Sequence, residues 1–255
     1  MIKAFLKKEW TQLRRTYPMA ILVLAMLVTG AISPIIIKYT PAILEKEGLD
    51  PSSLLGMISF DAPGSWASFF GNVRQLGLLT LVILLALEAG KEFRGQALVL
   101  MLGRGLPRST AIWAKILSGL LVWTVACLVS YLACGLLTLS LFGQTIVPGL
   151  WVPLAYFWLY GAVLVFVTVA GCAMAQGIFG GFLASGGFVA ITALISLWPS
   201  ADNYNPASMA ARGPAILAQP STQWDYLPAA LAAIAVAAAS VTMATRWYRG
   251  KKASN

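Results

Sequence analysis

Long apolar runs, separated by short breaks that contain polar residues, glycine or proline, dominate this chain. From Ile116 to Ala201, 86 consecutive residues contain no Asp, Glu, Lys or Arg. One crossing of a lipid bilayer needs only about 20 apolar residues, so this stretch must cross more than once. It is interrupted at Gly143–Gly149 and around Gln176–Gly181, where glycine and proline favour turns. The pattern therefore predicts three membrane spans in this region.

The rest of the chain supplies three further apolar runs. Only 13 uncharged residues lie between Arg74 and Glu88, too few for a crossing, so we expect the second span to begin near Trp66. This start places Arg74 within or just below the outer membrane interface. The pattern as a whole predicts an all-α, polytopic membrane protein with one domain and six transmembrane helices. The expected spans are 19–37, 66–89, 112–142, 150–175, 178–198 and 227–245.

The positions of Lys and Arg predict the orientation of these spans. Most of the 18 basic residues lie near the two termini and in the loop at 91–110. Lys and Arg favour the cytoplasmic side of short loops, so we expect both termini and this loop in the cytoplasm. Residues 40–65 and 199–225 then form outer loops. An odd number of spans would place the basic tail at 246–252 outside, which favours six.

The first 17 residues show the periodicity of an amphipathic helix. Apolar side chains recur on one helical face, whereas Lys3, Lys7, Lys8 and Arg14 lie off it. This pattern predicts a helix at 1–17 that lies along the inner membrane surface. The alternative is an ordinary basic flank that only fixes the topology of the first span.

Composition agrees with a lipid environment and argues against several functions. The chain is 59% hydrophobic and 11% charged, whereas about 25% of the residues of a soluble domain are charged. The net charge of +9 lies beside the spans, so we expect no nucleic acid partner. The sequence contains no histidine, which excludes serine–histidine catalysis and imidazole metal sites. We expect no catalytic residue, no metal and no cofactor bound by this chain.

The inner loop at 91–110 is the strongest functional candidate. It contains a short apolar segment between Arg94 and Arg108, which could press into a groove on a soluble partner while its charges orient it. Such a segment would couple the membrane spans to that partner. The alternative is that its positive charge only fixes the topology.

This loop resembles the signature region of ABC-2 type transporter permeases. Members of that family carry Glu-x-x-x-Gly-Thr, then leucines, then Pro-x-Ser-Arg, and a Lys seven residues after that Arg. The chain departs from the pattern at Gln96, Gly105 and Pro107, and Glu92 precedes Gly95 by three residues where the pattern has four. A stretch upstream, which includes Gln75, also resembles one branch of the family. The matching positions in the loop are Glu92, Arg94, Gly95, Leu98, Leu102, Arg108 and Lys115.

The resemblance implies a permease dimer, formed with a second copy or a paralogue, in which each loop rests on a separate ATP-hydrolysing ABC subunit. It also implies export. The sequence has no Gly-x-x-x-x-Gly-Lys-Ser/Thr phosphate loop, so ATP and Mg²⁺ are expected in that partner subunit. Because no eukaryotic targeting motif is visible, we expect a multi-pass protein of a bacterial plasma membrane. A passive channel, a membrane scaffold and an intramembrane enzyme are the alternative functions.

Ionisable residues of the second span are candidates for the transport pathway or an interface. Arg74 and Glu88 lie roughly 21 Å apart along a helix axis, with Gln75 beside Arg74. Charged groups inside a membrane usually face protein or a watery cavity. In the alternative reading, Arg74 reaches the outer headgroups and Glu88 begins the inner loop. Small residues at Ala173, Gly177, Gly181 and Ser185 predict either a helix-packing face or, for the glycines, a tight inner turn.

Overall fold

A computed structural model of the chain describes residues 17–48, 59–95, 108–143, 149–219 and 224–250. Within these ranges all regular secondary structure is helical, as predicted. The helices are α2 (Tyr17–Lys46), α3 (Ala62–Asn72), the π-helix η2 (Val73–Gly77), α4 (Leu78–Arg94), α6 (Arg108–Phe142), α7 (Trp151–Ala175), α8 (Ile178–Ile195), the 3-10 helix η3 (Pro199–Tyr204), α9 (Pro206–Ala211), α10 (Gly213–Ala218) and α11 (Leu227–Gly250).

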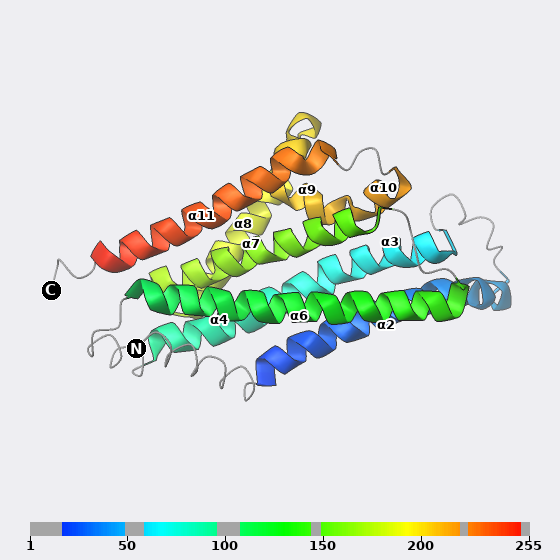
Figure 1. The fold of residues 1–255 in the computed structure, drawn as a ribbon, viewed down its shortest axis with the longest axis horizontal. Coiled ribbons are helices and arrows are strands. Elements are labelled where there is room, and N and C mark those ends of the chain that lie inside the picture. Colours follow the sequence, from blue (N-terminus) through cyan, green and yellow to red (C-terminus); the bar gives the residue numbers. More distant parts are fainter. Residues whose placement is uncertain (1–16, 49–58, 96–107, 144–148, 220–223, 251–255) are drawn as a thin grey trace.

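Six of these helical segments are long and apolar enough to cross a membrane, which confirms the expected all-α fold with six spans. The second span is a continuous rod, 62–94, formed by α3, η2 and α4. Figure 1 shows that α2, α6 and α8 run in one direction, and that the rod, α7 and α11 run in the other. The side that faces the cytoplasm stays a prediction, and the expected interfacial helix at 1–17 lies outside the described residues except for its last position.

Several helices extend beyond the apolar stretches that predict them. The first span was expected to end at 37, yet α2 continues to Lys46 and contains Pro34 and Pro41. Proline is tolerated in membrane helices where side-chain hydroxyls bond to nearby carbonyls. The Ser33 hydroxyl donates to the Thr29 carbonyl at 2.9 Å, and the Thr40 hydroxyl donates to the Ile36 carbonyl at 2.6 Å. The first part of the expected outer loop is therefore helical.

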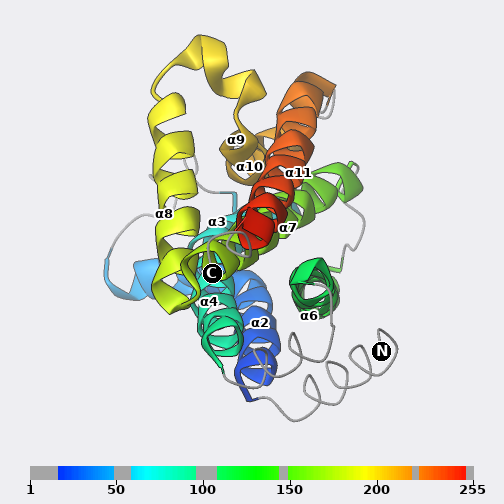
Figure 2. The same ribbon diagram turned by 90° about the vertical axis from the view of Figure 1, so that its left-hand side faces the viewer.

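Helix α7 occupies the centre of the bundle. In its most apolar window 78% of residues are buried, against 22% in the windows of α8 and α11, which lie at the periphery. Figure 2 shows α8 standing on the opposite side of the bundle from α6. Gly161 of α7 lets the ring of Trp123 approach closely, since a Cβ there would lie 2.2 Å from that ring. The Trp123 indole donates to the Trp158 carbonyl at 2.9 Å, which ties α6 to α7.

The connection between α7 and α8 is tighter than the sequence predicts. The turn consists of Gln176, which is left-handed with φ 53°, and Gly177. The glycine at 181 is not part of it, because α8 has already begun. A Cβ at Gly181 would lie 2.5 Å from the sulfur of Cys172, so this glycine instead permits close packing of α8 on α7. Both readings of the small-residue series thus apply, each to a different glycine.

Between α8 and α11, the short helices η3, α9 and α10 fold back over the bundle (Figure 2). Asn205 caps α9, since its side-chain oxygen accepts from the Ala207 N–H at 3.1 Å. Its amide also donates to the Thr192 carbonyl at 2.8 Å and to the Ser196 hydroxyl at 2.9 Å. Asn205 is 1% exposed, so it joins α9 to the end of α8 through satisfied, buried hydrogen bonds.

We expect Asn205→Ala to destabilise the protein by about 2 kcal/mol, because it removes the cap and leaves buried polar groups unsatisfied. The measurement is the midpoint of thermal unfolding in detergent. Asn203→Ala is the matched control, since Asn203 is exposed and lies two residues away. Equal midpoints for the two variants would contradict the proposed role of Asn205.

Candidate functional site

A buried ion pair joins the end of α4 to the first turns of α6, on either side of the loop motif. Glu92 lies in the last turn of α4, and Lys115 lies near the start of α6. The Lys115 Nζ atom is 2.7 Å from the Glu92 Oε2 atom, and the two side chains are only 5% and 14% exposed. A charge with so little access to water is strongly destabilising if its partner is removed. The pair therefore holds the end of α4 against the first turns of α6.

Other residues of the loop motif lie around this pair. The exposed Arg94 ends α4, and the Gly95 N–H donates to the Glu92 carbonyl at 3.1 Å. Gly95 has φ −75° and ψ 140°, which any residue can adopt, so its backbone does not require glycine. Arg108 is the first residue of α6. Leu98 and Leu102 lie outside the described residues.

The inner end of α4 also contacts α8. A Cβ at Gly90 would lie 2.5 Å from the backbone N and Cα atoms of Ile178, the first residue of α8. Glu88 lies two residues earlier, inside α4, and is only 8% exposed. It is thus a buried helical residue, whereas the sequence allowed it to begin the inner loop. The end of α4 thus contacts α6 through the Glu92–Lys115 pair and the start of α8 through Gly90.

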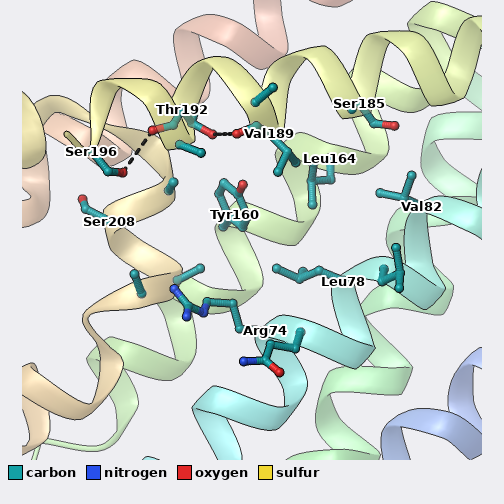
Figure 3. Close-up of a pocket in the computed structure, with 18 of the residues that line it drawn as sticks. Arg74, Leu78, Val82, Tyr160, Leu164, Ser185, Val189, Thr192, Ser196 and Ser208 are labelled. Atoms are coloured by element: carbon teal, nitrogen blue, oxygen red, sulfur yellow. Dashed lines mark hydrogen bonds between the residues drawn. The ribbon is translucent and has the colours of Figure 1, made fainter.

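A cavity of about 740 Å³ lies between the second span, α7, α8 and α9 (Figure 3). It is large enough for a drug-sized molecule. Arg74 and Gln75 both line it, so the structure brings together two of the three predicted pathway residues, and Glu88 is not among the lining residues. Its apolar walls include Leu78, Leu79, Val82, Leu164, Val189 and Ala193.

The π-helix η2 explains how Arg74 and Gln75 face the cavity. The Leu78 N–H bonds to the Val73 carbonyl, five residues earlier, which defines one wide helical turn. Val73 and Gly77 point into the bundle, where a Cβ at Gly77 would lie 2.7 Å from the sulfur of Met26. Single π turns inside α-helices often occur at functional sites. No pattern in the sequence predicted this turn.

Polar groups of the cavity lining come from the end of α8 and from η3 and α9, which no sequence pattern connected to the second span. Arg212 donates to Asp202 at 2.8 Å, and this hydrogen bond raises the pKa of Arg212 above its ordinary value. Thr192, Ser196 and Ser208 also line the cavity. The Asn205–Pro206 pair could have predicted a helix start here, because asparagine and proline favour the N-cap and first position of a helix.

Fold and composition together define a multi-pass helical membrane protein. Comparison with models of known protein families, with curated proteins and with solved structures gives no match for this chain. In the part of the chain that the structure describes, no group of three or more His, Cys, Asp or Glu side chains is placed to hold a metal ion.

Proposed function

We propose that this chain is the permease subunit of an ABC-2 type transporter. It forms the substrate pathway through the membrane, exports its substrate, and couples through the loop at 92–108 to a separate ATPase subunit. The observation that carries the proposal is the buried Glu92–Lys115 pair, which joins two residues of the loop motif across the base of that loop.

The second span connects the loop to the cavity through one continuous helical rod. The rod 62–94 carries Glu92 near its inner-loop end and Arg74 in the cavity wall. Since the ion pair fixes α4 to α6, a push on the loop moves both helices together. The close contact at Gly90 transmits the same movement to α8, which forms another cavity wall. Nucleotide-driven movement of an ATPase could thus change the shape of the cavity.

The proposal requires partners that the chain does not contain. ATP and Mg²⁺ would bind to the ATPase subunit, because this sequence has no phosphate loop. A second permease copy or paralogue would complete the pathway. The exposed apolar face of α8 offers area for that contact or for lipid; it includes Phe179, Leu183, Ile191 and Leu194.

The alternative function is a passive channel or a membrane scaffold. Neither needs a buried ion pair at the base of one inner loop, nor a rigid path from that loop to a cavity. An intramembrane enzyme is a weaker alternative, because the sequence lacks histidine and no Asp lies in the six spans expected from the sequence.

Site-specific photocrosslinking in the native membrane tests the proposal. A photoreactive amino acid replaces Arg94, which is exposed beside the loop, or Tyr204, which is exposed at the opposite end of the bundle. We expect the probe at 94, and not the probe at 204, to form an adduct with a soluble ATP-binding protein. If neither position yields such an adduct, or both do, the loop is not the ATPase contact.

A further inference from the structure

We propose that the cavity beside η2 binds an amphiphile that carries one anionic headgroup, with that headgroup at Arg74. The inference deepens the proposed function, because it names the chemical class of molecule that the permease would carry. It rests on three observations: the charge balance of the cavity lining, the hydrogen-bonding state of the lining hydroxyls, and the position of Arg74 along the second span.

The charged side chains of the lining leave one positive charge without an anionic partner among them, that of Arg74. Three ionised side chains line the cavity: Arg74, Asp202 and Arg212. Arg212 is paired with Asp202 at 2.8 Å, so these two charges offset each other. Among the described residues, Arg74 has neither an ion pair nor a hydrogen bond. Its guanidinium extends from η2 past Tyr160 of α7 toward α9, the helix that carries Ser208 (Figure 3).

The serine and threonine hydroxyls in the lining have already donated their protons. Thr192 donates to the Phe188 carbonyl at 3.0 Å, and Ser196 donates to the Thr192 carbonyl at 3.0 Å. Ser208 donates to the Asn205 carbonyl at 2.7 Å, and Ser185 donates to the Gly181 carbonyl at 2.7 Å. The guanidinium of Arg74, the neighbouring Gln75 amide and the Tyr160 hydroxyl are further donors in the lining. Such donors suit a carboxylate, phosphate or sulfate, to which arginine binds in a bidentate manner.

The apolar wall predicts what is attached to the anion. Leu78, Leu79 and Val82 follow Arg74 along the second span, and Leu164 and Val189 face them from α7 and α8. Arg74 lies 12 residues from Ala62 and 20 residues from Arg94, which corresponds to about 18 Å and 30 Å along a helix. The cation is thus nearer the end of the rod opposite the inner loop. An acyl or similar chain bound at Arg74 would extend from there along the leucines.

Binding of labelled lauric acid to the purified full chain tests this site. The measurement is a scintillation proximity assay in maltoside detergent, with excess unlabelled lauric acid to define specific binding. We expect saturable binding to the wild type, and binding weakened about tenfold or more by Arg74→Gln, because a charge-assisted contact is lost. Arg246→Gln removes the same charge from an exposed position on α11 and should bind like the wild type.

A second variant tests the cavity independently of Arg74, and a neutral probe tests the need for the negative charge. Ala193→Phe fills the cavity without changing any charge, and we expect it to reduce binding even if Arg74→Gln does not fold. Dodecanol has the same chain without the charge and should not displace lauric acid. Equal binding by the wild type and the folded Arg74→Gln variant, unchanged binding to Ala193→Phe, or displacement by dodecanol as strong as that by lauric acid would overturn the proposal.

Competing lipids identify the source of the anion. If phosphatidylglycerol displaces lauric acid and phosphatidylcholine with the same chains does not, the ligand class is an anionic membrane lipid. If neither lipid displaces it, the class is a soluble single-chain anion. No ATPase is present in this assay, so its failure would leave the coupling proposal intact, and absence of an ATPase partner would leave the binding result intact.

Discussion

Lys115→Met is expected to uncouple ATP hydrolysis from transport, with a fall of about tenfold in substrate moved per ATP. The substitution leaves the Glu92 carboxylate without the cation that lies 2.7 Å away, in a position that is only 14% exposed. We also expect a loss of about 3 kcal/mol in stability, because removal of one member of a buried pair is costly. Transport and hydrolysis are measured together in proteoliposomes that contain the chain and its co-purified ATPase.

Two further variants separate the ion pair from general effects of charge. Lys46→Met removes the same charge from an exposed position at the end of α2, and both measurements should match the wild type. The exchange Glu92→Lys with Lys115→Glu retains an ion pair in reversed order, and we expect it to recover part of the coupling. If Lys115→Met retains full coupling, or if Lys46→Met loses as much, the pair does not connect the loop to the spans.

Gly90→Val is expected to destabilise the protein far more than Gly71→Val, a substitution in the same span. A Cβ at Gly90 would lie 2.5 Å from backbone atoms of Ile178, and backbone cannot move aside as a flexible side chain can. Overpacking typically costs about 1–3 kcal/mol and can cost more where the neighbour is rigid. The measurement is the midpoint of thermal unfolding in detergent, with the transport assay as a second readout.

The same helical rod contains a matched control. A Cβ at Gly71 would meet no atom within 4 Å, so Gly71→Val should change the unfolding midpoint little. We expect Gly90→Val to reduce transport as well, because it separates α4 from the start of α8. An unfolding midpoint for Gly90→Val that equals that of Gly71→Val would show that α4 and α8 do not pack as the structure places them.

The apolar content of the sequence predicted the number of spans. It did not predict features that depend on contacts between helices, such as the helix ends and the role of individual glycines. Charge-free runs predicted six spans, because each crossing needs a long stretch compatible with lipid. The same runs could not predict where each helix ends, because a helix can continue past its apolar stretch. Helix α2, for example, continues into polar residues up to Lys46. The glycine at 181 was open to two readings because its role depends on Cys172, a residue in another helix.

For the candidate site too, the sequence identified individual residues but not the contacts between them. Glu92 and Lys115 were both named from their place in a motif, but only the structure shows that they form a 2.7 Å pair. Arg74 was a candidate because charge is costly inside a membrane. Its cavity also requires Arg212 and Ser208, which come from a segment more than a hundred residues later. No local periodicity in the second span could predict that the segment between α8 and α11 folds over it.

Isolation of this chain from its native membrane in mild detergent tests the central claim most directly. Every co-purifying protein is identified and quantified by mass spectrometry. The account predicts a soluble ABC ATPase subunit in stoichiometric amount, together with either a second copy of this chain or a paralogous permease. If no ATPase co-purifies, and none associates when candidate ATPases are co-expressed with the chain, the coupling function is wrong and a channel or scaffold becomes the leading explanation.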